Sequence, residues 1–256
     1  MLLNQVYNMD CLEGLRLLPD NHIDLTVTSP PYDDLRAYNG YSFDFENIAK
    51  ELYRVTKQGG IVVWIVGDRT SNGSETGTSF KQALHFKEIG FNLHDTMIWH
   101  KPNAMPQLDK TRFTQSFEYM FVLSKGKPKI ANPLKVPTKN GGEFLSRGDG
   151  NNQNKNKKGG NVVNKYRIAF NVYTLSVGGK NYGHPAIFPE KLAEDHILSW
   201  SNPGDTILDP FMGSGTVAKM ALLNGRNYLG YEISEEYCNE IIKPRLRELE
   251  NYESVL

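Results

Sequence analysis

The stretch Thr206-Ile-Leu-Asp-Pro-Phe-Met-Gly-Ser-Gly-Thr-Val-Ala-Lys-Met-Ala-Leu-Leu223 carries the strongest indication of the fold. Its first part, Thr206 to Phe211, predicts a short buried strand, and Val217 to Leu223 predict a helix. A glycine turn between a strand and a helix is typical of a nucleotide-type site. Gly213 and Gly215 allow the backbone to turn tightly and a ligand to approach without interference from a Cβ atom.

An acidic residue follows this turn at a suitable distance. Asn227 to Ile233 predict another strand, and Glu232 near its end lies seventeen residues beyond Gly215, where a carboxylate can accept hydrogen bonds from ribose hydroxyls. The third glycine of the phosphate-binding fingerprint is missing, since Thr216, Val217 and Ala218 follow Gly215. This favours a nucleoside ligand without a pyrophosphate. The alternative is a glycine turn that only packs.

The rest of the chain alternates predicted strands and helices. Because this alternation is typical of α/β proteins, we expect a mostly parallel sheet. A glycine pair, Gly59-Gly60, is expected to end the first of the longer helices. The predicted strands are His22–Thr28, Ile61–Val66, Leu93–His100 and Tyr119–Leu123, and the predicted helices are Phe45–Thr56, Phe80–Ile89 and Glu190–Trp200.

The composition excludes several classes of protein. With 256 residues, 39% of them hydrophobic and 23% charged, the chain is not disordered, collagen-like or a repeat array. The longest apolar run, Gly59 to Gly67, has nine residues, whereas a membrane helix needs roughly 20. Residues 1–10 lack the features of a secretory signal, so we expect a cytoplasmic protein without a membrane partner. Two cysteines and six histidines without ligand spacing predict no metal site.

The net charge is zero, but the charges are unevenly distributed. Lys125 to Arg167 contain eleven Lys and Arg against two acidic residues, a local charge of about +9. Within this stretch, Lys139 to Asn164 contain seven Asn and six Gly, too polar a composition to make a core. A long, mobile, basic loop is expected, either for phosphate contacts or as a solvated linker.

A second motif, Thr28-Ser-Pro-Pro-Tyr32, ends the first predicted strand. Two consecutive prolines have no N–H donors and restrict the backbone, so the neighbouring carbonyl groups point outward rigidly. Ser29 and the Pro30 carbonyl can accept the two hydrogens of an amino group, and Tyr32 offers a face for stacking on a planar base. By itself, Pro-Pro-Tyr is more often an ordinary turn or a proline-rich ligand.

Taken together, the motifs resemble those of the DNA amino-methyltransferases that use S-adenosylmethionine, in the permuted order with the catalytic motif first. Thr28–Tyr32 resembles the catalytic motif, and Asp209–Thr216 resembles the cofactor loop. Further similar segments are Asn8–Leu15, Glu51–Gly60, Trp99–Pro102, Glu118–Gly126 and His184–Leu192. Residues 129–182 lack a match, and at this position the family has its target-recognition region.

The resemblance implies a Rossmann-like methyltransferase sheet, mostly parallel with an antiparallel hairpin and with helices on both faces. It divides the chain into a catalytic part at 1–126, an inserted target-recognition region at 127–182, and a cofactor-binding part at 183–256. The implied catalytic residues are Ser29, Pro30, Pro31 and Tyr32. The implied residues for S-adenosylmethionine are Asp10, Cys11, His184, Pro185, Phe188, Asp209, Phe211, Gly213, Ser214, Gly215, Thr216 and Glu232.

Two departures bear on the amine that is methylated. Ser29 occupies a position where Ser is associated with N4-cytosine enzymes and Asp with N6-adenine enzymes, although adenine enzymes with Ser also occur. Phe188 stands where relatives with the Asp form often carry lysine. Both favour cytosine as the target in double-stranded DNA, with adenine as the alternative.

Other functional classes stay open at this point. A Rossmann-type oxidoreductase would need the third glycine and has no role for Ser-Pro-Pro-Tyr. A catalytically silent nucleic-acid-binding module would not need both motifs, and an RNA methyltransferase would share all the chemistry. A homodimer and a cognate restriction endonuclease are further candidate partners.

Overall fold

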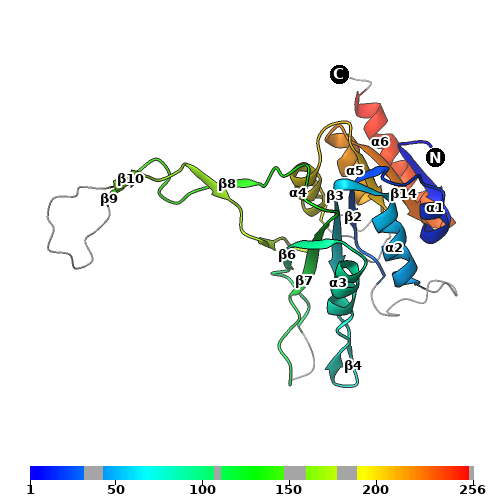
Figure 1. Ribbon diagram of the computed structural model, residues 1–256, viewed down its shortest axis with the longest axis horizontal. Helices are drawn as coiled ribbons and strands as arrows, with labels where there is room; N and C mark the ends of the chain where they lie inside the picture. Colours follow the sequence, from blue (N-terminus) through cyan, green and yellow to red (C-terminus); the bar gives the residue numbers. More distant parts are fainter. Residues whose placement is uncertain (32–42, 107–110, 147–159, 178–188, 254–256) are drawn as a thin grey trace. The chain divides into compact units, whose positions relative to one another are not determined.

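A computed structural model describes residues 1–31, 43–106, 111–146, 160–177 and 189–253. The chain forms two compact units (Figure 1). The larger unit consists of Met1–Asn132 and Asn171–Leu256, and the smaller one is Pro133–Phe170.

The larger unit contains an eight-stranded sheet in the order β1-β14-β13-β2-β3-β7-β6-β12. Neighbouring strands are parallel except at β7, which runs antiparallel to both β3 and β6. The predicted mostly parallel sheet with an antiparallel hairpin is therefore confirmed. The strands are β1 (Gln5–Asn8), β2 (Ile23–Thr28), β3 (Thr56–Val66), β6 (Asn92–His100), β7 (Phe117–Ser124), β12 (Val172–Thr174), β13 (Thr206–Asp209) and β14 (Asn227–Glu232).

Helices cover both faces of this sheet, as expected. The two faces bury separate apolar clusters, and β3 supplies both: Ile61, Val63 and Ile65 belong to one, and Val62 and Trp64 to the other. A central strand covered on both sides must be apolar throughout, which explains its continuous apolar run. One face packs against α1 (Cys11–Arg16), α2 (Phe45–Val55) and α3 (Thr78–Glu88), and the other against α4 (Glu190–Trp200), α5 (Thr216–Leu223), the π-helical turn η1 (Tyr237–Ile242) and α6 (Lys243–Glu253).

One local prediction is wrong. The Gly59-Gly60 pair does not end the helix, because α2 ends at Val55 and both glycines lie inside β3. Gly59 has a φ of 81°, and its N–H donates to the Lys125 carbonyl at 2.7 Å. A left-handed residue is tolerated in this strand because it is glycine.

The smaller unit, Pro133–Phe170, departs from the expected loop. Two short antiparallel ribbons form in it: β8 (Lys135–Pro137) pairs with β11 (Tyr166–Ile168), and β9 (Phe144–Ser146) pairs with β10 (Gly160–Val162). Each ribbon pairs only three residues of one strand with three of the other, and a two-stranded ribbon of this kind contributes little stability of its own. Large apolar side chains stay exposed, for example Ile168 at 61%. Residues 147–159 of the predicted basic loop lie outside the described residues.

A small hairpin follows β3 and consists of β4 (Thr70–Ser71) and β5 (Ser74–Glu75). Its turn residues Asn72 and Gly73 both have positive φ, as a type I′ hairpin turn requires. In the described part of the chain, no helix has the length and apolar character needed to cross a membrane.

Candidate active site

Four neighbouring parallel strands bring the sequence motifs to one edge of the sheet. Asp10 follows β1, Glu232 ends β14, Asp209 ends β13, and Ser29 follows β2. The register places Asn8 opposite Glu232 and Asp209 opposite Gly230, so these strand ends are level with one another. Residues that are far apart in sequence thus lie together at the carboxyl edge, where open α/β sheets bind their ligands.

A buried hydrogen bond joins the two principal motifs. The Thr28 hydroxyl donates to Asp209 Oδ1 at 2.7 Å, and the same oxygen accepts from the Phe211 N–H at 3.1 Å. Asp209 is only 2% exposed. It therefore links the end of the strand before Ser29-Pro30-Pro31 to the start of the glycine turn. Ser29 is half-buried and Pro30 is buried.

Burial dominates the acid-base chemistry of this carboxyl group. Loss of hydration raises the pKa of Asp209 to about 7, while the hydrogen bonds from Thr28 and Phe211 lower it and the nearby charge of Glu232 raises it further. The native protein thus holds a proton that the unfolded chain releases at lower pH.

We expect this proton to make the free energy of unfolding fall as the pH rises from about 4 to about 7. In that window the native state binds more protons than the unfolded state. Asp209→Asn keeps an oxygen that can accept from Thr28 and Phe211 but does not titrate. Urea unfolding at several pH values should show a weaker pH dependence for the variant, by an amount on the order of a few kcal/mol across the window. Equal slopes for the two proteins would contradict the raised pKa.

The glycine turn is held by Glu232. Gly213 donates its N–H to Glu232 Oε2 at 2.8 Å, and Ser234 donates its N–H to Oε1 at 2.9 Å. Burial raises the pKa of Glu232, and these backbone donors act against that rise. Gly213 and Gly215 have φ values of 54° and 76°. A Cβ on Gly215 would also come within 3.1 Å of Ile242, so both space and conformation favour glycine there.

The β1 side of the edge contributes Asp10 and Cys11. Asp10 caps α1 by accepting from the N–H groups of Leu12 at 2.8 Å and Glu13 at 3.2 Å. The Asn8 side chain donates to the Glu232 carbonyl at 2.9 Å, which joins the ends of β1 and β14. Cys11 is buried, and burial raises the pKa of its thiol to about 12. The thiol therefore stays neutral and packs, as expected for a structural cysteine.

This set of groups fits the adenosyl part of S-adenosylmethionine. The carboxylates of Asp10 and Glu232 suit hydroxyl and amine donors, and the half-buried Gly213 permits close approach of a ligand. Phe211 is also half-buried, and its ring meets that of Phe43 edge to face at 5.7 Å. An apolar ring beside acceptors is the chemistry that a nucleoside requires.

Ser214 and Thr216, both predicted to bind the cofactor, are buried against another side chain of the protein. Ser214 and Thr216 are 4% and 3% exposed, and both side chains contact Arg245 on α6. Arg245 was not singled out from the sequence, because nothing local distinguishes one arginine on a polar helix. Thr28 was quoted as part of the catalytic motif, but its bond to Asp209 was not predicted. Four predicted site residues lie outside the described residues: Tyr32, His184, Pro185 and Phe188.

Comparison with known proteins identifies the class. The model of a DNA methylase family of N6 and N4 methyltransferases matches residues 23–243. The chain belongs to this DNA methylase family. The predicted class is confirmed: the protein is an S-adenosylmethionine-dependent DNA amino-methyltransferase of the N4-cytosine or N6-adenine type.

Particular relatives cover nearly the whole chain. The chain is 57% identical over 242 residues to Orphan methyltransferase M.BamHII of Bacillus amyloliquefaciens, covering 89% of this chain and 90% of the relative. The PvuII DNA methyltransferase (cytosine-N4-specific) has a similar structure, with a TM-score of 0.69, 21% identity, and coverage of 96% of this chain and 91% of the other. The M1.HpyAVI–SAM complex gives a TM-score of 0.63 at 23% identity, covering 94% and 98%. These two structures support the Rossmann-like fold.

Proposed function

We propose that the protein methylates N4 of cytosine in double-stranded DNA, with the target base turned out of the duplex and Ser29-Pro30-Pro31-Tyr32 forming the catalytic edge. The observation that carries this proposal is the buried Thr28–Asp209 hydrogen bond. This hydrogen bond joins the last residue of β2 to the last residue of the adjacent strand β13. It supports the proposal that Ser29 acts beside the predicted cofactor loop.

The reaction chiefly requires positioning. S-adenosylmethionine supplies an electrophilic methyl group on a sulfonium. An exocyclic amine conjugated to its ring is a poor nucleophile. Groups that accept hydrogen bonds from both of its N–H groups can favour a geometry in which the nitrogen lone pair points at the methyl group. Ser29 and the Pro30 carbonyl are the proposed acceptors, and Tyr32 the proposed stacking partner. Stacking offsets part of the few kcal/mol that extruding a base costs.

The preference for cytosine rests on two residues. Ser29 and Phe188 both depart from the pattern associated with adenine enzymes. The N4-cytosine specificity in the name of the PvuII enzyme is consistent with this preference, although that likeness concerns the fold. N6-adenine methylation is the alternative and would use the same acceptors. A homodimer and a cognate endonuclease stay predictions.

Product analysis tests the proposal directly. Unmethylated double-stranded DNA is incubated with the protein and S-adenosylmethionine, digested to nucleosides, and analysed by mass spectrometry against standards. N4-methylcytosine is the expected product. N6-methyladenine would overturn the base assignment and leave the class intact, whereas methylation of RNA alone would overturn DNA as the substrate.

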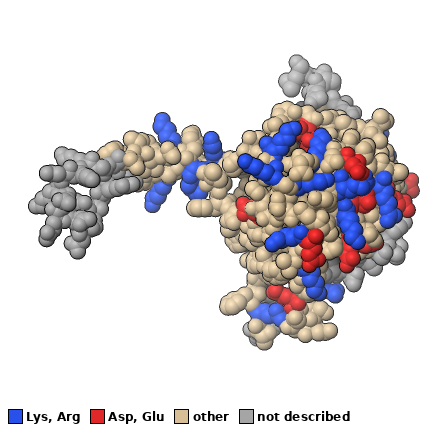
Figure 2. Space-filling model, viewed as in Figure 1, with Lys and Arg blue, Asp and Glu red and all other residues tan. Residues whose placement is uncertain are grey.

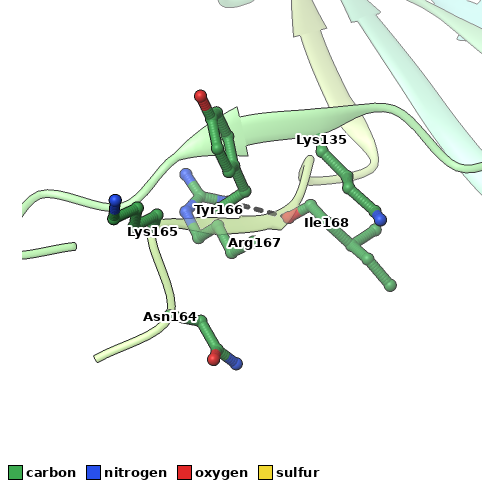
Figure 3. A pocket seen from close by; sticks show the side chains of 6 residues that line it. All are labelled: Lys135, Asn164, Lys165, Tyr166, Arg167 and Ile168. Carbon is green, nitrogen blue, oxygen red and sulfur yellow. Dashed lines mark hydrogen bonds between the residues drawn. The ribbon is translucent and has the colours of Figure 1, made fainter. Parts of the chain in front are cut away.

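The smaller unit, Pro133–Phe170, is the proposed target-recognition element. Its described residues contain four Lys and Arg against one acid, and Figure 2 shows basic side chains exposed on it. The β8–β11 ribbon borders an open pocket of about 520 Å³ (Figure 3). The guanidinium of Arg167 lies 3.8 Å from the Phe170 ring centre and donates to the Ile168 carbonyl at 3.1 Å. Residues lining the pocket are Lys135, Asn164, Lys165, Tyr166, Arg167 and Ile168.

Exposed cations can contact the phosphates of a nucleic acid, and exposed aromatic rings beside them can contact its bases. We expect the double variant Lys165→Gln/Arg167→Gln to bind DNA more weakly and with a shallower salt dependence. The slope of log K against log salt should fall by up to about 0.9 for each phosphate that the variant no longer neutralises. Fluorescence anisotropy at several salt concentrations measures both quantities.

A matched double variant, Lys50→Gln/Lys87→Gln, removes two positive charges elsewhere. Both lysines are exposed, and they lie on α2 and α3, outside the predicted target-recognition region. If the two double variants showed equal decreases in affinity and salt dependence, the ribbon would have no special part in DNA binding.

A further inference from the structure

A buried arginine on α6 holds the glycine turn from the inside. Arg245 is only 5% exposed, which is rare for a charged side chain unless it is paired. Its Nη1 donates to the Ser214 carbonyl at 2.8 Å, to Ser214 Oγ at 3.1 Å and to Thr216 Oγ1 at 3.2 Å. One nitrogen of the guanidinium thus lies among three oxygens of the turn.

The other terminal nitrogen pairs with a carboxylate. Arg245 Nη2 lies 2.5 Å from Glu190 Oε1 at the start of α4, and Lys219 on α5 donates to the same oxygen at 2.7 Å. Burial raises the pKa of Glu190, but the hydrogen bonds and charges of Lys219 and Arg245 outweigh it and leave the pKa lowered. Glu190 therefore stays ionised and supplies the countercharge that a buried guanidinium needs.

This arrangement changes the interpretation of Ser214 and Thr216. Both were predicted to bind the cofactor, yet their buried hydroxyl oxygens lie 3.2 Å apart and both contact Arg245. Between them, Gly215 adopts a left-handed conformation. Because glycine can adopt many backbone conformations, contacts from neighbouring groups are needed to restrict the turn to one of them. Arg245 and Glu190 provide such support from two different helices.

We propose that Arg245 is a positioning residue that holds the glycine turn in the shape that receives S-adenosylmethionine, and that Ser214 and Thr216 act on cofactor affinity through it. The inference rests on the proposed use of this turn by the cofactor. The ion pair with Glu190 makes the start of α4 part of the same support. Arg245 itself is buried and is proposed to contact the turn but not the cofactor.

The test compares two buried arginines. Arg245→Gln removes the guanidinium beside the turn, and Arg245→Lys keeps a cation that can restore one part of the contacts. Arg226→Gln is the matched control: Arg226 is 7% exposed and makes three hydrogen bonds, to Ser201 and Asn224 near the other edge of the sheet. Thermal unfolding measures how far each substitution lowers stability.

Two readouts distinguish positioning from general stability. Hydrogen exchange without cofactor reports on residues 211–216 directly, and calorimetry gives the dissociation constant of S-adenosylmethionine. We expect faster exchange in this segment and about tenfold to hundredfold weaker binding for Arg245→Gln. Arg245→Lys should be intermediate, and Arg226→Gln should change neither readout. Arg245→Gln should raise KM for S-adenosylmethionine by a larger factor than it lowers kcat.

Other results would overturn the inference. Unchanged exchange and affinity in Arg245→Gln would show that the turn keeps its shape without the guanidinium. Equal changes in Arg245→Gln and Arg226→Gln would show a general effect of stability. If the wild-type protein did not bind S-adenosylmethionine, the proposed function would fail, and with it the role of Arg245 in cofactor affinity.

Discussion

Ser29→Ala should lower the methylation rate by about a hundredfold or more while the affinity for S-adenosylmethionine stays close to that of the wild type. Ser29 follows β2 at the carboxyl edge and is the proposed acceptor for one hydrogen of the target amine. Alanine removes this acceptor where the amine must become nucleophilic. The proposed cofactor-binding groups on β13 and β14 are left intact, so we expect the substitution to affect catalysis and not cofactor binding.

Single-turnover methylation and calorimetry measure these two effects. Thr28→Ser is a suitable neighbouring control, because it keeps the hydroxyl that donates to Asp209 and should retain most of the activity. Tyr32→Ala should behave like Ser29→Ala, through the loss of stacking on the extruded base. Turnover at the wild-type rate in Ser29→Ala would show that the catalytic edge has been assigned to the wrong segment.

Glu232→Ala should have the second large effect, a decrease in S-adenosylmethionine affinity of about a hundredfold or more. Its carboxylate accepts from the Gly213 and Ser234 N–H groups and is also the proposed acceptor for ribose hydroxyls. Alanine leaves these two backbone donors without their partner and removes the acceptor for the ligand. Each hydrogen bond to a charged group is worth roughly 1.5 to 3 kcal/mol.

Glu232→Gln should fall between alanine and the wild type, because the amide keeps one acceptor oxygen but turns an NH₂ group toward one of the two donors. Glu236→Ala removes an exposed carboxylate four residues further along the chain and should leave affinity unchanged. Calorimetric titration compares the four proteins. Wild-type affinity in Glu232→Ala would exclude Glu232 from the cofactor site.

Much of the fold followed from local patterns. The buried runs of β2 and β3 and the helix α4 were predicted closely, because strands covered on two faces are apolar and helices show a 3.6-residue period. The short elements β1 and α1 were not predicted as strand and helix. Four and six residues are too few for a period to stand out, and they are stabilised by pairing with β14 and packing on the sheet.

The basic region shows a different limit of sequence patterns. In the described part of its Asn- and Gly-rich stretch, the large apolar side chains of Phe144 and Val162 are exposed, which agrees with the prediction that this composition is too polar to make a core. The ribbons β8–β11 and β9–β10 were missed because each needs only a few backbone hydrogen bonds between residues that are 14 to 33 positions apart in sequence. Such pairing leaves little trace in the side-chain pattern.

The sequence by itself determined the class of this protein. The two motifs, in their permuted order, each follow a predicted strand, so their residue types indicate the chemistry expected at the carboxyl ends of parallel strands. The tertiary structure alone decided how these groups depend on one another. It showed that the Thr28 hydroxyl donates a hydrogen bond to Asp209 and that Glu232 accepts one from the Gly213 N–H. It also showed that Arg245 donates hydrogen bonds to the hydroxyl oxygens of Ser214 and Thr216. The physical reason is that these contacts join residues from 19 to 181 positions apart, and only the packing of the sheet and its helices brings such residues within hydrogen-bonding distance.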